Sequence, residues 1–325
     1  MLIGVFRANR PGGLFLLPLL LALLWPGAAP RTWAPQDVPP GMPLARIFQG
    51  ALAQPWSEIL LSAALVIICC LLLADLSNRN ALLGQRNYLP ALYLPILLAL
   101  WPGGLHVTPA LLGMPFVLIA ARAMLAPGGR GAALMPLFDA GMLLAVATLF
   151  NLSYGFLIVA VWASLSVMRP FQWREYVMPT LGFLVVLFLA WGLLRLWPVV
   201  AWDPIASLKA GAPRPWVRHW MHDLVLMVWA VFAGLVFMAH VYGDYSRSVM
   251  QAKNIRAAVF ALSLSMVLMA GLEMFLLRDR VQAVMIAVPL ALLGGHSLSG
   301  ERTNGWGEAA FWGLLLLALW GRWIG

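Results

Sequence analysis

Long hydrophobic runs recur from one end of the chain to the other, separated by short polar stretches. After a first apolar stretch at residues 14–25, we place them at 56–75, 88–102, 107–125, 132–149, 152–168, 177–197, 221–242, 256–276, 282–298 and 308–323. Apolar runs of about 20 residues cross a bilayer as helices. None shows the roughly ten-residue polar/apolar alternation of a transmembrane barrel. The pattern therefore predicts an all-α, polytopic transmembrane helical bundle of about eleven helices.

Composition supports this class. The chain has 325 residues, of which 62% are hydrophobic and only 10% are charged, whereas soluble domains carry about 25% charged residues. No soluble domain of any size fits between the runs. We therefore expect residues 1–325 to form a single integral membrane domain.

The first apolar stretch has two interpretations. Arg7 and Arg10 precede it and small residues follow it, which is the arrangement of a secretory signal peptide. We favour a retained first helix, because ten more hydrophobic segments follow. Cleavage remains the alternative.

A short helix is expected after the first span. In the proline-rich stretch 30–55, "MPLARIFQGAL" repeats apolar residues at helical spacing and keeps its polar residues off that face. The apolar face consists of Leu44, Ile47, Phe48 and Ala51. This helix lies either on the membrane surface or against the bundle.

The segment at residues 88–102 differs from the other runs. Pro90 and Pro95 interrupt "NYLPALYLPILLALWPGG", and the run is short. Proline removes a helical hydrogen bond and bends the helix. We expect a kinked or re-entrant segment there.

The basic residues indicate an orientation. The formal net charge is +9, but the arginines are scattered over loop edges. Without a clustered basic face a nucleic-acid partner is not expected, and membrane lipids are. An N-terminus in the cytoplasm of a bacterial inner membrane places slightly more than half of the 21 basic residues inside. They are Arg7, Arg10, Arg79, Arg86, Arg122, Arg130, Arg169, Arg174, Arg247, Lys253, Arg256 and Arg302.

This orientation puts the two largest loops, 30–55 and 198–220, together on the outer face. "RPWVRHWMHDL" at residues 214–224 is the densest polar cluster. Its two histidines are three positions apart, as metal ligands often are, but no further ligand set accompanies them. An aromatic and basic interfacial belt is therefore favoured over a metal site.

If the outer face is catalytic, these loops hold the available groups. The acid/base candidates are Asp37 and Asp223, and the substrate-binding candidates are Arg214, Arg218, His219 and His222.

Four polar residues fall within or beside the apolar runs. Asp139 lies in the first turns of its helix, where a carboxylate is favoured, and Asn151 lies at the opposite end. Glu273 is expected to pair with Arg278 or Arg280, with a substrate cation as the alternative. His240 is expected to be a hydrogen-bonded interhelical residue.

Common cofactor motifs are absent from the sequence. It has no Walker A loop, no Rossmann glycine pattern and no GxSxG elbow. The only cysteines, Cys69 and Cys70, are adjacent on a predicted helix, so they suit neither a mutual disulfide nor a metal set. We expect no cofactor and no metal, and read both cysteines as packing residues.

Three features of the middle of the chain form a recognisable set: an R-N-Y-x-P entry to an early helix, a small-residue helix hairpin and an R-P-F-x-W-R-E turn. The motif positions are Arg86, Asn87, Tyr88 and Pro90, then Arg169, Pro170, Phe171, Trp173, Arg174 and Glu175. In these features the chain resembles an uncharacterised family of polytopic inner-membrane proteins from Bacteroidota, in which the first motif reads R/K-N-Y/F-x-P. The resemblance covers about the middle third of the chain and implies membership without an activity. The second motif fits a cytoplasmic connector with headgroup anchors, or a docking site for a cytoplasmic partner.

Three functional classes remain. The first is a glycosyltransferase- or polymerase-like enzyme of cell-envelope biogenesis acting on a lipid-linked substrate such as a polyprenyl-linked glycan. The second is a non-enzymatic subunit or scaffold of an envelope complex. The third, a transporter, is disfavoured because the sequence shows no internal repeat and few intramembrane charges.

Overall fold

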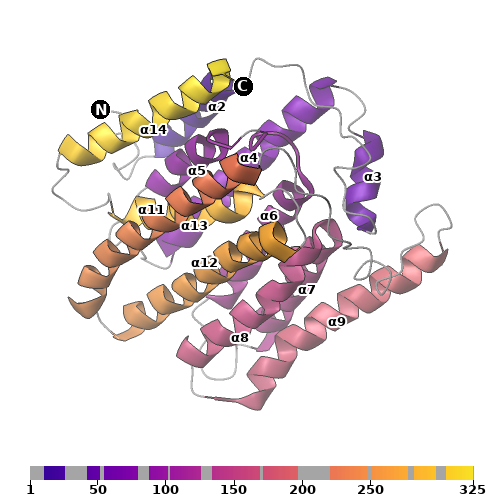
Figure 1. The fold of residues 1–325 in the computed structure, drawn as a ribbon. Helices are drawn as coiled ribbons and strands as arrows, with labels where there is room; N and C mark the ends of the chain where they lie inside the picture. Colours follow the sequence, from indigo (N-terminus) through magenta and orange to yellow (C-terminus); the bar gives the residue numbers. More distant parts are fainter. Residues whose placement is uncertain are drawn as a thin grey trace.

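The computed structural model describes residues 11–25, 42–51, 55–79, 88–101, 103–125, 134–168, 171–196, 220–247, 250–276, 282–297 and 305–324. Over these ranges the chain is helical and contains no strand, which confirms the all-α class (Figure 1). The elements are η1 (Pro11–Leu16), α2 (Leu17–Leu24), α3 (Pro43–Ala51), α4 (Pro55–Arg79), α5 (Leu89–Ala99), α6 (Pro109–Met124), α7 (Leu134–Phe150), η3 (Leu152–Phe156), α8 (Leu157–Met168), α9 (Trp173–Leu196), α11 (Trp220–Arg247), α12 (Met250–Leu276), α13 (Ala283–Ser297) and α14 (Gly305–Ile324).

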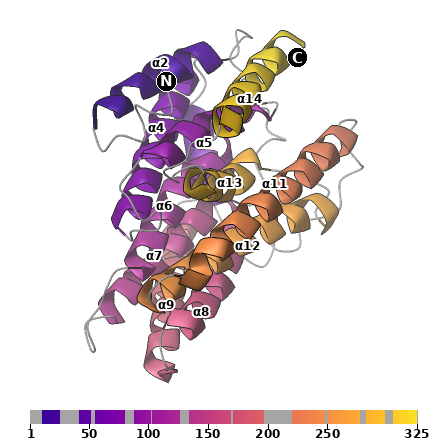
Figure 2. The same ribbon diagram turned by 90° about the vertical axis from the view of Figure 1, so that its left-hand side faces the viewer.

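The helices form a bundle around α5 and α13. Helix α5 packs against α4, α13 and α14, and α13 packs against α11 and α12 (Figures 1 and 2). Helices α6, α7 and α9 follow one another along one side, α8 packs on α12, and α2 lies at the end of the bundle near α14. One continuous cluster of buried side chains runs from Leu17 in α2 to Ala318 in α14.

Three of the described helices are long and apolar enough to cross a membrane. They are Trp56–Arg79 in α4, Trp173–Leu196 in α9 and Lys253–Leu272 in α12. Eight further apolar helical stretches of 10–17 residues occur among the described residues. Two of them belong to α11 and α14, which are 28 and 20 residues long. Among the described residues, these three helices have the length and hydropathy of full spans, and the number of eleven spans stays a prediction.

The predicted irregularity at residues 88–102 has a structural counterpart. Helix α5 has 11 residues, about 16 Å at 1.5 Å per residue, against a hydrocarbon core of about 30 Å. Every residue from Leu89 to Leu98 is buried. Helix α5 is thus a short helix enclosed by its neighbours, with Pro95 inside it.

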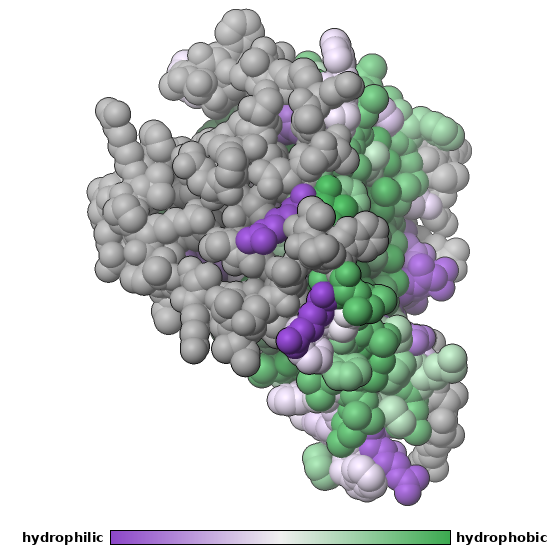
Figure 3. Space-filling model, turned by 90° about the vertical axis from the view of Figure 1, so that its right-hand side faces the viewer, coloured by the Kyte–Doolittle hydropathy of each residue, from purple (hydrophilic) through white to green (hydrophobic). Residues whose placement is uncertain are grey.

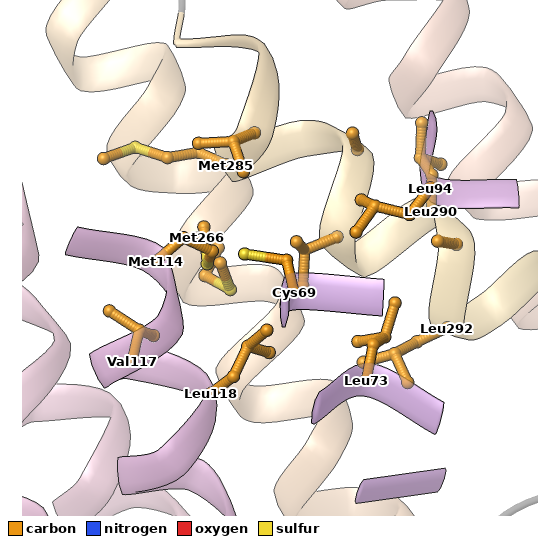
Figure 4. Close-up of a cluster of buried hydrophobic side chains, with 14 of the residues drawn as sticks. Cys69, Leu73, Leu94, Met114, Val117, Leu118, Met266, Met285, Leu290 and Leu292 are labelled. Carbon is orange, nitrogen blue, oxygen red and sulfur yellow. The ribbon is translucent and has the colours of Figure 1, made fainter. Parts of the chain in front are cut away.

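The core is apolar and rich in sulfur-containing side chains. Cys69 of α4, Met114 of α6, Met266 of α12 and Met285 of α13 meet there with leucines from α4, α5, α6 and α13 (Figure 4). Both cysteines are free and fully buried, which confirms their reading as packing residues. Unbranched methionine fills the irregular gaps between helices that cross at different angles.

The outer surface is also apolar. On the side of the molecule shown in Figure 3, hydrophobic residues (green) form most of the described surface, and hydrophilic residues (purple) are few and separate. Helix α9 is the extreme case, because only Glu175, Pro179 and Gly182 are buried along its length. Apolar surface on this scale marks a membrane or protein contact.

Helix α3 lies against the bundle at the end of α7, as one of the two expected placements requires, and its position relative to a membrane surface stays a prediction. The Phe48 ring lies 5.7 Å from that of Phe150 at the end of α7, and Met42 and Ala45 are buried against Leu152. The predicted apolar face was partly wrong, because Ile47 is 50% exposed. The buried face is therefore rotated toward Met42 and Ala45.

Candidate functional site

A buried carboxylate and an imidazole meet where α4 begins. Glu58 lies in the first turn of α4, where the helix dipole favours a negative charge. Its Oε1 lies 2.9 Å from Nδ1 of His106, in the turn between α5 and α6. The Glu58 side chain is 2% exposed and the His106 side chain 13%. The buried Glu58 carboxylate therefore fixes one side of the imidazole ring, while part of the ring is exposed at the protein surface.

The α5–α6 turn fixes the position of His106. Gly103 has a φ of 76°, which glycine adopts without the penalty of a side chain. The His106 backbone N–H donates to the Gly103 carbonyl at 3.0 Å. The Ser62 hydroxyl of α4 donates to the Leu105 carbonyl. Because Glu58 and Ser62 are one helical turn apart, the same face of α4 holds the turn at two successive residues.

One aromatic ring lies beside this pair. Trp25, at the end of α2, lies edge-on to His106 with ring centroids 6.4 Å apart. Glu58 Oε2 and Trp101 Nε1 are buried and have no hydrogen-bond partner among the described residues. A carboxylate that orients an imidazole is the arrangement of a general acid/base. We call Glu58 and His106 the outer pair.

A second buried carboxylate lies at the start of η3. Asn151 Nδ2 donates to Glu273 Oε1 at 3.2 Å, and the Ser153 hydroxyl donates to the same oxygen. All three residues are buried. Beside them, the Tyr154 hydroxyl donates to the Ala110 carbonyl at 2.6 Å. Each of these bonds joins η3 to a distant helix, so the cluster fixes where the chain turns after α7.

A third polar group lies at the other ends of α4 and α6. Asp75 accepts from Arg79 Nε at 2.7 Å and lies 3.1 Å from Nη1 of Arg122. Both arginines are well exposed, at 61% and 40%. Exposed pairs of this kind contribute about 0–1 kcal/mol. We regard this group as a surface contact.

The structure describes only some of the predicted site residues. Asp37, Arg214, Arg218 and His219 lie outside the described residues. His222, Asp223 and His240 belong to α11, but the positions of their side chains are not among the described features. The predicted convergence of outer-face groups therefore stays a prediction.

The predicted intramembrane residues separate into exposed and buried ones. Asp139 is exposed in the second turn of α7, and Asn151 lies at the turn after α7, as expected. The described partners of Glu273 are Asn151 and Ser153. Its expected partners Arg278 and Arg280 lie outside the described residues.

The motif residues have local roles where they are described. A Cβ added to Gly295 of α13 would stand 2.7 Å from Cγ of Pro90, so this proline marks a close α5–α13 contact. Trp173 is 63% exposed, with the Arg174 guanidinium 5.7 Å from its ring centroid. Glu175 is buried in the first turn of α9. Arg86, Asn87, Arg169 and Pro170 lie outside the described residues.

The pairing of Glu58 with His106 was not predicted from the sequence. Glu58 follows "QPWS" at the start of an apolar run, and His106 follows "PGGL". Both positions look like ordinary loop edges, and 47 residues separate them in the chain. The available signal was that both residues fall at the outer ends of their predicted spans.

No group of three or more metal-ligating side chains occurs among the described residues. Comparison with known protein families, curated proteins and solved structures finds no match to this chain.

Proposed function

We propose that this chain is a multi-pass inner-membrane enzyme of cell-envelope biogenesis that transfers a group from a lipid-linked substrate, in the manner of a glycosyltransferase or polymerase. The observation that carries the proposal is the outer pair. It combines a buried carboxylate with a partly exposed imidazole at 2.9 Å. It lies at the start of α4, which the charge pattern assigns to the outer face.

The chemistry follows from this geometry. An acceptor hydroxyl attacks the sugar carbon that is bonded to the lipid phosphate. A new C–O bond forms, the bond to phosphate breaks, and the lipid phosphate leaves with the electron pair. His106 takes the hydroxyl proton through Nε2, and Glu58 stabilises the resulting imidazolium through Nδ1. Trp25 supplies apolar surface beside the reacting groups.

A genetic test uses the full chain in its own membrane. A strain without the gene is complemented with wild type, His106→Gln or Glu58→Gln. Lipid-linked glycans are then measured by mass spectrometry at matched protein levels. We expect both variants to accumulate the substrate as the deletion does. Arg79→Gln serves as control, because it removes a polar contact at the other end of α4.

If His106→Gln complements the deletion fully and leaves the pool of lipid-linked glycans unchanged from wild type, the proposal is wrong. The buried hydrogen bond would then serve stability alone.

A second candidate is a non-enzymatic subunit of an envelope complex. It is favoured by α9, where large apolar side chains such as Phe188 and Leu193 are 68% and 66% exposed. Crosslinking in native membranes distinguishes the two possibilities. A subunit gives a discrete protein adduct from this face, whereas lipid contact alone gives none.

Transport is supported least. Asp139 is exposed, and Glu273 is bonded to Asn151 and Ser153. Among the described residues, no chain of hydrogen bonds joins these two residues through the core of the bundle.

A further inference from the structure

Arg256 is a charged residue on a buried stripe of α12. It lies three, seven and fourteen positions before Val259, Ser263 and Ala270, a spacing that places these residues on nearly one helix face. Val259, Ser263 and Ala270 are 7%, 5% and 0% exposed. The Arg256 side chain therefore starts from the side of α12 that faces the bundle.

Two of the three guanidinium nitrogens of Arg256 have no hydrogen-bond partner in the described part of the chain. They are Nε and Nη1, and both are buried. Arginine stays charged in proteins, and an unpaired buried charge is strongly unfavourable. Three of the described carboxylates have other partners: Glu58 meets His106, Asp75 meets two arginines, and Glu273 meets Asn151 and Ser153.

We propose that Arg256 binds a phosphate-class anion, and that the anion is the headgroup phosphate of an acidic phospholipid. The side chains of an α-helix lean toward its N-terminus, and α12 begins at Met250. Arg256 is thus about 9 Å along the helix at 1.5 Å per residue, and its guanidinium extends back toward the membrane surface.

The charge near Arg256 is positive, as a site for a phosphate anion requires. Lys253 lies one turn earlier on α12 and is half-buried. The first turn of α12 contains no acidic residue, and its free N–H groups add positive potential. Basic pockets between membrane helices on the cytoplasmic side bind acidic headgroups, and α12 begins on that side in the proposed orientation. This site is separate from the outer pair and does not depend on enzymatic activity.

The test measures thermal stability of the full chain purified in a neutral detergent. Wild type and Arg256→Met are each titrated with dioleoylphosphatidylglycerol, with dioleoylglycerol, which has the same acyl chains without phosphate, and with inorganic phosphate. Arg195→Met is the matched control, because it removes an exposed arginine that lies over Trp191 of α9 and is outside the proposed headgroup anchors.

We expect Arg256→Met to be at least as stable as wild type before lipid is added, since it removes an uncompensated charge. Phosphatidylglycerol should raise the melting temperature of wild type and of Arg195→Met. Half-saturation in Arg256→Met should need at least about tenfold more lipid, the usual cost of losing a charged donor. Arg256→Lys keeps the charge and should fall between the two. Dioleoylglycerol should act equally on all variants.

Inorganic phosphate distinguishes two sources of the anion. An Arg256-dependent rise in stability with phosphate, and none with phosphatidylglycerol, would support the anion site and overturn its assignment to lipid. Equal responses of wild type and Arg256→Met to every ligand would overturn the site itself.

Discussion

Gly141 of α7 packs directly against the backbone of Pro179 in α9, so that a Cβ at Gly141 would overlap the Pro179 carbonyl. The contact is reciprocal, because a Cβ at Gly182 of α9 would overlap the carbonyl of Phe138. Small residues at such crossings allow helix backbones to approach closely where lipid leaves no hydrophobic drive for association. These two glycines therefore attach α9 to the bundle.

Gly141→Leu should weaken the α7–α9 contact. The added side chain meets backbone atoms, which cannot move aside as a flexible side chain would. We expect a loss of about 1–3 kcal/mol or more in the free energy of unfolding, measured by SDS titration in mixed micelles. Gly192→Leu on α9 is the control, because nothing lies within 4 Å of its added Cβ. Equal losses from both substitutions would contradict this role of Gly141.

Two buried tyrosines give a paired prediction. The Tyr154 hydroxyl donates to the Ala110 carbonyl, whereas the Tyr93 hydroxyl is buried without a partner among the described residues. Tyr154→Phe should cost about 0.5–1.5 kcal/mol. Tyr93→Phe should be neutral or stabilising, since it removes an unsatisfied polar atom. The same SDS titration checks both, and a larger loss for Tyr93→Phe would contradict the assigned hydrogen bonds.

The helical class could be predicted because it depends on local chemistry. Runs such as 132–149 and 256–276 are apolar enough to define their helices, and the structure places α7 and α12 over them. Hydrophobicity predicts which segments are helical, but it does not separate helices that cross a membrane from helices that neighbouring helices enclose. Helix α5 is as apolar as a span, yet it is short and buried by neighbouring helices.

The candidate site could not be predicted because its contacts are long-range. Glu58 and His106 meet only after the α5–α6 turn folds onto α4, and Glu273 reaches Asn151 across 122 positions of the chain. A single sequence shows that these residues are polar and near span ends. Which of them meet depends on how the helices pack.

Asn151 and Glu273 should be energetically coupled. Asn151→Ala removes a donor from a buried carboxylate and should cost about 1–3 kcal/mol. In a Glu273→Leu background the same substitution should cost clearly less, so the double-mutant cycle should show a coupling of about 1 kcal/mol or more. Thr148→Val is the control, because the Thr148 hydroxyl bonds to Leu144 of its own helix. Its cost should be equal in both backgrounds, and additivity for Asn151 would contradict the contact.

The proposed orientation predicts which helix ends face the same compartment. The polar contacts of the structure join ends that the charge pattern puts together: Glu58 with His106 outside, and Asp75 with Arg122 inside. Trp56, at the start of α4, and Trp173, at the start of α9, are 75% and 63% exposed and belong to opposite sides.

Cysteine labelling tests this assignment. The two native cysteines need not be replaced, because both are completely buried. In intact spheroplasts a membrane-impermeant maleimide should label Trp56→Cys and leave Trp173→Cys unlabelled until the membrane is opened. Cys69 and Cys70 should react only after denaturation, which makes the unsubstituted protein its own blank. Labelling of both introduced thiols from the same side would refute the orientation. The outer pair would then lose its assigned compartment, while its hydrogen bond and the helix packing around it would stand.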